Sequence, residues 1–184
     1  MKRIAKIGIA LTLGVSIIGA AVGLSHVVKP SQPIYAFDLK RDYNDIMTLM
    51  KNNWYWLISS PDYNADFMLR HKAPSHKDPR YFGKLQIKVL RPENKFAGFV
   101  AFYKKYPGQG QLLFLAVDKD FRGKRYGNLL MDHALGEMKQ QGITRVSLVT
   151  RVSNYPAQEV YKRAGFDEIG RDETFVYYEK DLAD

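Results

Sequence analysis

A basic turn between an apolar run and a helical segment constrains the fold of this chain more than any other feature. The apolar run ends at Val117, residues 118–125 form the turn, and helical periodicity starts at Tyr126. The first backbone N–H groups of a helix have no partner inside the helix, and the helix dipole places partial positive charge there. The order strand, turn and helix therefore predicts a phosphate-bearing ligand at the start of this helix.

Three basic side chains lie at the end of this turn, next to the helix. Arg122, Lys124 and Arg125 would add full positive charges beside the unpaired N–H groups at the helix start. The alternative interpretation is a solvated basic turn without a ligand. We favour phosphate binding, because the turn leads directly into a helix N-terminus.

Composition excludes several classes of function. The chain has no cysteine, which excludes disulfides, thiolate metal sites and a cysteine nucleophile. The four histidines are scattered, and none forms a pair four residues apart on a helix, so we expect no metal site. The formal net charge is +9, but four positive charges precede the first acidic residue, Asp38. The remaining charge suits an anionic cofactor and is too small to predict a nucleic-acid partner.

Residues 1–31 are expected to form a separate N-terminal unit. A basic leader with Lys2, Arg3 and Lys6 precedes residues 7–24, which carry no charge and predict a hydrophobic helix. This segment is just long enough to cross a membrane as a signal anchor. It also fits a signal peptide that is cleaved during export. The anchor predicts a membrane-anchored protein, and the cleaved signal predicts an exported one. The end of the unit is expected to be a linker to the domain that follows.

Residues 32–184 are expected to form one α+β domain. Alternating apolar residues predict strands, and apolar residues three and four positions apart predict helices. The expected strands cover residues 34–39, 85–89, 96–103, 111–117, 146–152 and 173–180. The expected helices cover residues 42–50, 64–69 and 126–141, with one more beginning near Pro156 and ending before Gly165. This order predicts a sheet whose first half is mostly antiparallel.

Two segments of the domain carry a family resemblance. Residues 122–127 read Arg-Gly-Lys-Arg-Tyr-Gly, which resembles the acetyl-CoA motif Gln/Arg-x-x-Gly-x-Gly/Ala of the GNAT superfamily of N-acetyltransferases. A second element matches downstream, with Asn154-Tyr-Pro-Ala followed by Tyr161-Lys-Arg-Ala-Gly-Phe. The resemblance covers residues 85–180, while residues 34–69 agree in element order only. It implies a GNAT-like fold, with a mixed central sheet of about six to seven strands flanked by about four helices.

The resemblance also implies roles for individual residues, with acetyl-CoA as co-substrate. Residues 123–127 would hold the pyrophosphate through their backbone N–H groups. The main chain of Leu115 and Val117 would pair with the pantetheine arm, which requires the following strand to separate from theirs. Asn154 would hydrogen-bond the cofactor, and Tyr161 would protonate the departing thiolate. The implied cofactor-binding residues are thus Leu115, Val117, Arg122, Gly123, Lys124, Arg125, Tyr126, Gly127 and Asn154.

The chain departs from the family pattern at two positions. Arg125 stands where the family usually has glycine, and we expect a negative φ there because the residue opens a helix. Its side chain would then turn outward and could meet a phosphate. Gln111 occupies the position comparable to a glutamate that serves as general base in several family members, and an amide cannot accept a proton. Water, Asp118 and a tyrosine near the C-terminus remain as alternatives.

The function that the resemblance implies is transfer of an acetyl group from acetyl-CoA to a primary amine. The amine would attack the thioester directly, since no nucleophile of the chain is arranged for a covalent intermediate. The acceptor is either a small-molecule amine or a protein or peptide amine. The alternative is an inactive CoA-binding or protein-interaction module on the same fold. Six aromatic residues either line an acceptor pocket or belong to the core: Trp54, Tyr55, Trp56, Tyr63, Tyr81 and Phe82.

Overall fold

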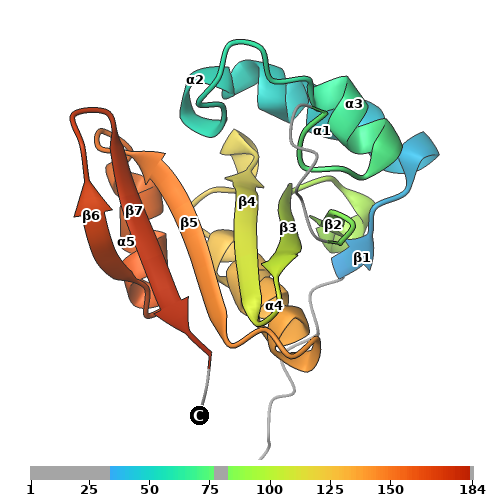
Figure 1. Cartoon of the computed structure of the whole chain (residues 1–184). Helices are drawn as coiled ribbons and strands as arrows, with labels where there is room; N and C mark the ends of the chain where they lie inside the picture. The colour runs from blue at the N-terminus through green and yellow to red at the C-terminus, as the bar shows by residue number, and fades with distance from the viewer. Residues whose placement is uncertain (1–33, 77–82, 183–184) are drawn as a thin grey trace, which may run out of the picture. The chain divides into compact units, whose positions relative to one another are not determined.

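The structure is a computed structural model, and it describes residues 34–76 and 83–182. These residues form a seven-stranded sheet in the order β1-β2-β3-β4-β5-β7-β6 (Figure 1). Among these strands only β4 and β5 pair in parallel, so the sheet is mixed as predicted. The strands are β1 (Ile34–Ala36), β2 (Gln86–Leu90), β3 (Gly98–Tyr106), β4 (Gln109–Val117), β5 (Arg145–Arg151), β6 (Asp167–Arg171) and β7 (Phe175–Asp181).

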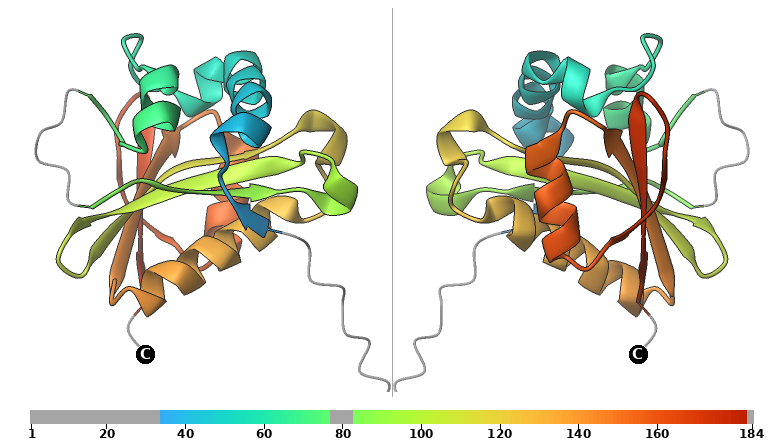
Figure 2. Two further views of the ribbon diagram at one scale, coloured as in Figure 1. Left: turned by 90° about the vertical axis from the view of Figure 1, so that its right-hand side faces the viewer. Right: turned by 90° about the vertical axis from the view of Figure 1, so that its left-hand side faces the viewer.

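Helices cover both faces of the sheet. They are α1 (Leu39–Asn52), α2 (Trp54–Leu57), α3 (Ala65–His71), α4 (Tyr126–Gln140) and α5 (Tyr155–Arg163). One buried cluster joins α1 and α3 to one face, and a second cluster joins α4 and α5 to the other face. Figure 2 shows α1 and α3 on one side of the strands and α4 on the opposite side. The predicted α+β class is confirmed.

Short polar side chains start the first helices. The Asp38 carboxylate accepts a hydrogen bond from the Arg41 backbone N–H at 2.8 Å, and α1 begins at the next residue. The Asn64 side chain accepts from the Phe67 backbone N–H at 2.8 Å and caps α3 in the same way. Each bond satisfies one of the N–H groups that a helix start leaves unpaired. These caps fix where the chain leaves the sheet and becomes helical.

A β-bulge separates β4 from β5. Ala101 of β3 lies opposite Phe114, whereas the next residue of β3 lies opposite Leu112, so that Leu113 is an extra residue on β4. The bulge also reverses the faces of the strand, because Leu112 packs in the cluster of α4 and α5 and Phe114 in the cluster of α1 and α3. The parallel pairing with β5 ends at Gln111, directly before the bulge. The predicted separation of the two strands is therefore present.

Strand β6 is the main difference from the predicted elements. All five of its residues are exposed, so it has no alternation of apolar and polar residues that would have predicted a strand. It pairs only with β7 and forms the edge of the sheet. The segment forms a strand because it pairs with β7, and not because its own residues favour a strand.

The predicted hydrophobic helix at residues 7–24 lies outside the described residues, and the boundary at residue 31 stays a prediction. The predicted location, membrane-anchored or exported, requires correction. Within residues 34–76 and 83–182 no helix is both long and apolar enough to cross a membrane.

Candidate active site

A cavity of about 580 Å³ opens where β4 and β5 separate. Every predicted site residue except Lys124 lines this cavity. The lining comes from the end of β4, the turn after it, the first residues of α4, α2 and the length of α5. The predicted residues that line it are Leu115, Val117, Arg122, Gly123, Arg125, Tyr126, Gly127, Asn154 and Tyr161.

The N-terminus of α4 presents unpaired backbone N–H groups to this cavity. The first hydrogen bond within the helix runs from the Leu129 N–H to the Arg125 carbonyl at 3.1 Å. The N–H groups of Tyr126, Gly127 and Asn128 precede that bond, so they have no partner inside the helix, and all three residues line the cavity. Such an arrangement binds an anionic group such as a phosphate.

The backbone conformation of Arg125 contradicts the prediction. Its φ is +61°, in the left-handed region, where a negative φ was expected. Gly123 has a φ of +78°, so the turn needs two left-handed residues to bring the chain from β4 into α4. Left-handed backbone costs a residue with a side chain about 1–2 kcal/mol, which explains why a glycine would suit the position of Arg125.

The three basic side chains nearest the start of α4 have different surroundings. Arg122 donates from Nη2 to the Asn53 Oδ1 atom at 2.9 Å and from Nε to the Val117 carbonyl at 3.2 Å. The Lys124 ammonium lies over the ring of Phe121, 5.0 Å from its centre, and does not line the cavity. Arg125 lines the cavity. Of the three charges, that of Arg125 is thus the best placed to meet a bound anion.

The end of β4 presents to the cavity an edge that pairs with no β5 residue, and on this edge the Val117 carbonyl accepts the hydrogen bond from Arg122. The Asp118 N–H donates to the Ala97 carbonyl at 2.9 Å, on the side of β3. Because backbone groups alternate in direction along a strand, those of Leu115 and Val117 point to the opposite side, from which β5 has separated. An extended ligand can therefore pair with this edge in place of a strand.

Asn154 lies at the start of α5, beside the separation. It occupies the N-cap position, but its side chain makes no capping bond. Instead its Nδ2 atom donates to the Thr150 hydroxyl oxygen at 3.2 Å. The side chain is thereby held at the cavity wall, where its amide oxygen can accept a further hydrogen bond.

Tyr161 lies deeper in the same cavity and is 6% exposed. Its ring packs against Tyr178 at 5.9 Å and Phe166 at 6.3 Å between ring centres. Burial raises the pKa of Tyr161 above its ordinary value, and the neighbouring Tyr178 raises it further. The hydroxyl is therefore protonated at neutral pH and can act as a proton donor.

The candidates for the general base lie away from the cavity. Gln111 accepts a hydrogen bond from the Ser147 hydroxyl at 3.0 Å, at the end of β4 where the strands still pair. Asp118 accepts from the Asp120 backbone N–H at 3.0 Å and so stabilises the turn. The Tyr177 hydroxyl donates to Asp172 at 2.7 Å. None of these three side chains lines the cavity.

Helix α2 contributes residues that the motifs did not indicate. Asn53, Trp56 and Leu57 line the cavity, and the Trp56 side chain is 44% exposed. The sequence left two alternatives for the aromatic residues, a place in the core or in an acceptor pocket. Tyr55 and Trp56 are exposed, which excludes the core for both residues. Tyr63 is largely buried against Phe114, with ring centres 5.4 Å apart. Tyr81 and Phe82 lie outside the described residues.

Comparisons with known proteins agree with this geometry. The [ribosomal protein bS18]-alanine N-acetyltransferase of Salmonella typhimurium is 27% identical over 119 residues, which cover 61% of this chain and 79% of that protein. Ard1 from Thermoplasma volcanium has a similar structure, with a TM-score of 0.66 at 20% identity, covering 83% of this chain and 98% of that one. The PaiA N-acetyltransferase from Thermoplasma acidophilum, solved in complex with coenzyme A, has a TM-score of 0.63 at 18% identity, covering 82% and 98%.

The family match covers most of the domain. Residues 43–166 match the profile of the acetyltransferase (GNAT) family, and this range contains the turn after β4, all of α4 and both motifs of the site. The predicted N-acetyltransferase activity is confirmed at the level of the enzyme class. The chain therefore belongs to the GNAT family of acetyltransferases.

Proposed function

We propose that this enzyme transfers the acetyl group of acetyl-CoA to a primary amine by direct attack on the thioester. One observation carries the proposal: a single cavity joins an anion-binding helix start, a free strand edge and a buried tyrosine hydroxyl. These features match, in order, the pyrophosphate, the amide-containing arm and the leaving thiolate of acetyl-CoA. A relative in the family was solved with coenzyme A, which supports the same donor for this chain.

Each residue then has a defined task. The N–H groups of Tyr126, Gly127 and Asn128 bind the pyrophosphate, with Arg125 as an additional charge. The backbone of Leu115 and Val117 pairs with the amides of the arm, and the Asn154 side chain accepts a hydrogen bond from it. The amine attacks the carbonyl carbon, the carbon–sulfur bond breaks, and Tyr161 protonates the sulfur that leaves. The amine loses its proton to water, and the Tyr161 oxygen recovers a proton from solvent. The acetylated amine and coenzyme A are the products.

The acceptor is a primary amine, either a small molecule or the amine of a protein or peptide. The relative from Salmonella typhimurium is named as an N-acetyltransferase for an alanine of a ribosomal protein, which supports a protein or peptide amine. The exposed aromatic residues of α2 beside the cavity support an acceptor with an apolar group next to the amine.

The binding of acetyl-CoA is tested by thermal unfolding of the full-length chain. A ligand that binds only the folded protein stabilises it by about 2.7 kcal/mol at a concentration of 100 Kd, so acetyl-CoA is expected to raise the midpoint of unfolding. ADP, which has the pyrophosphate without the arm, is expected to give a smaller shift. No shift with saturating acetyl-CoA would contradict the proposal.

Transfer is tested by the release of coenzyme A thiol. The chain has no cysteine, so a thiol-reactive chromophore reports the product without background from the protein. A panel of a small amine, a peptide with a free N-terminus and a blocked peptide with one lysine separates the acceptor types. Binding of acetyl-CoA without transfer to any of them would favour the inactive module.

A further inference from the structure

Helix α2 lies beside the opening between β4 and β5, and its own backbone does little to hold it there. It has four residues, and the Ile58 N–H donates to the Trp54 carbonyl at 2.9 Å to close its single turn. A helix of one turn is not stable by itself, because the cost of forming the first turn is not recovered by further hydrogen bonds. The position of α2 must therefore be fixed by other parts of the domain.

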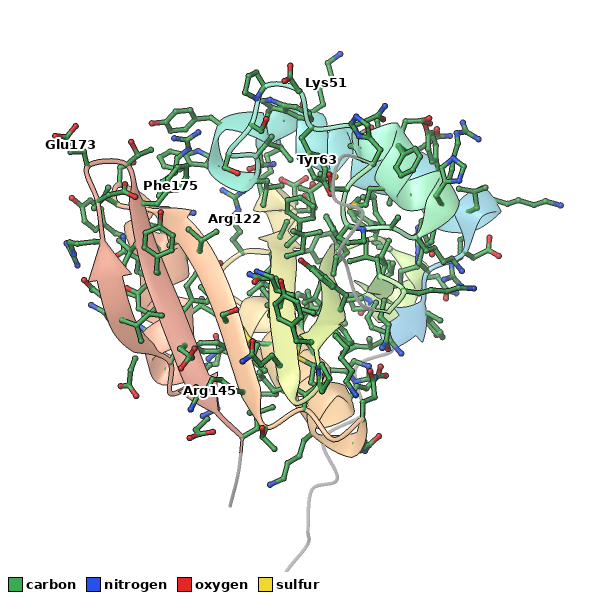
Figure 3. All side chains as sticks on the ribbon, viewed as in Figure 1. Lys51, Tyr63, Arg122, Arg145, Glu173 and Phe175 are labelled. Atoms are coloured by element: carbon green, nitrogen blue, oxygen red, sulfur yellow. The ribbon has the colours of Figure 1, made fainter. Side chains whose placement is uncertain are left out.

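Two arginines reach α2 from the two strands that separate. Arg122 follows β4, and its Nη2 atom donates to Asn53, the residue that joins α1 to α2, at 2.9 Å. Arg151 ends β5, and its Nε atom donates to the Tyr55 carbonyl at 2.5 Å and its Nη2 atom to the Ile58 carbonyl at 3.3 Å. Figure 3 shows Arg122 below α2, between the ends of these two strands.

The Arg151 side chain also stacks on aromatic rings. Its guanidinium lies 4.1 Å from the ring centre of Tyr55 and 5.3 Å from that of Phe175, which begins β7. Arginine is suited to this task because its planar group can donate several hydrogen bonds and stack on aromatic rings simultaneously. A lysine at the same position would provide neither the paired bonds nor the stacking.

The position of α2 also indicates the side from which the acceptor approaches the thioester. The first residues of α4 belong to the face covered by α4 and α5, whereas α2 follows α1 on the chain and adjoins the face covered by α1 and α3. A cofactor with its phosphates at α4 and its arm along β4 brings its thioester to the separation of the strands. The acceptor then reaches the thioester from the side of α2.

We propose that Arg122 and Arg151 are positioning residues that hold α2 as the acceptor wall, and that Trp56 contacts the acceptor. This inference rests on the proposed function and adds a substrate class to it. The half-exposed indole of Trp56 lines the cavity and offers an apolar surface to a group beside the amine. The Arg122 guanidinium lines the same cavity and repels an acceptor with several positive charges. The acceptor class is a primary amine that bears an apolar group.

Tryptophan fluorescence of the full-length protein tests the position of α2 without any substrate. Both tryptophans of the chain, Trp54 and Trp56, lie on α2, so a Trp54→Phe background leaves Trp56 as the sole reporter. In that background Arg122→Ala and Arg151→Ala are expected to lower the anisotropy of Trp56 and to increase its quenching by acrylamide. Lys124→Ala removes the same charge from the same turn and is expected to change neither signal. Unchanged signals in both arginine variants would overturn the positioning roles.

Steady-state kinetics tests the contact with the acceptor. With phenylethylamine as the probe, Trp56→Ala is expected to raise the KM of the amine about tenfold, as for other apolar contacts in a binding pocket. The KM of acetyl-CoA is expected to stay within about twofold, since a contact with the amine is not made to the cofactor. An equal or larger rise in the KM of acetyl-CoA would assign Trp56 to the cofactor instead and overturn the contact.

Spermidine, a primary amine with several positive charges, is compared with phenylethylamine to test the proposed class of acceptor. A higher kcat/KM for spermidine than for phenylethylamine, or no turnover of phenylethylamine, would overturn the assigned class. Failure of acetyl-CoA to stabilise the unsubstituted protein would instead overturn the proposed function. The fluorescence result does not depend on that binding, so the two failures are distinguishable.

Discussion

Arg91 at the end of β2 donates from Nε to the Asp42 carboxylate on α1 at 2.9 Å, and the Asp42 side chain is completely buried. The same carboxylate accepts hydrogen bonds from the Arg41 side chain and, at 2.9 Å, from the Asp38 backbone N–H. This carboxylate therefore joins the start of α1 to the sheet, and the C-cap residue of the same helix, Asn53, lines the cavity.

We predict that Asp42→Asn lowers the free energy of unfolding by about 3 kcal/mol, because Arg91 then loses its buried partner. Burial alone would raise the pKa of Asp42, but the hydrogen bonds from Arg41, Asp38 and Arg91 outweigh it and hold the pKa below its usual value. The contribution of Asp42 is therefore fully present above the unfolded pKa of about 3.9 and is lost as the pH falls through the lower folded value.

Urea unfolding at several pH values measures both effects. The Asn variant is expected to lose stability less steeply than the parent below about pH 4, since it has no carboxylate to protonate. Asp66→Asn is the control, because Asp66 has a similarly lowered pKa but forms an exposed ion pair with Arg70. Equal losses for the two variants would contradict the role of the buried pair.

Replacing Tyr161 by Phe tests its role as the acid. Phenylalanine keeps the ring that packs against Tyr178 and Phe166, so binding of acetyl-CoA is expected to persist. The value of kcat is expected to fall about 100-fold, as for the loss of a positioned proton donor. Because the pKa of Tyr161 is raised by burial, its protonation is not expected to limit the rate of the parent enzyme below pH 10. Equal values of kcat for variant and parent would remove Tyr161 from the mechanism.

Local patterns predicted most of the fold. The helix after the basic turn was expected at residues 126–141 and spans Tyr126–Gln140, because its apolar residues repeat with a helical period. Strand β6 has no such pattern, since all its residues are exposed at the sheet edge. The bulge at Leu113 was equally hidden, because it depends on how β3 pairs with β4 and not on the residues of β4 alone.

The site was predictable where a motif places it and unpredictable where distant segments meet. The motif residues gather around the cavity because a strand, a turn and a helix follow each other in the sequence. Trp56 and Asn53 belong to the same cavity but lie far from the motifs along the chain. The hydrogen bonds from Arg122 to Asn53 and from Arg151 to the Tyr55 carbonyl join segments that are distant in the sequence, and tertiary structure sets these partners. The left-handed φ of Arg125 was missed because a helix start was expected to have helical backbone.

Two substitutions at Arg125 separate backbone strain from charge. Arg125→Gly and Arg125→Ala both remove the guanidinium, but only glycine accepts a φ of +61° without strain. We predict that the Gly variant is more stable than the Ala variant by about 1 kcal/mol in urea unfolding. Both variants are expected to bind acetyl-CoA several-fold more weakly than the parent, by about the same factor, since both lose one charge at the phosphate end. A weaker affinity in the Gly variant alone would show that backbone freedom, and not charge, governs binding.

Gly98 is predicted to be irreplaceable, because the backbone of β4 at Ala116 and Val117 leaves no space for a side chain there. A Cβ atom on Gly98 would lie 2.3 Å from the Ala116 carbonyl oxygen, and its φ of +158° disfavours any side chain. Gly98→Ala must therefore push β4 away and is expected to cost about 3 kcal/mol of stability and to weaken acetyl-CoA binding. Gly136→Ala is the control, since that glycine lies inside α4 with nothing near its Cβ position. It is expected to stabilise the protein by about 0.5–1 kcal/mol. A Gly98→Ala protein with unchanged stability and cofactor affinity would show that β4 can shift freely at its open edge.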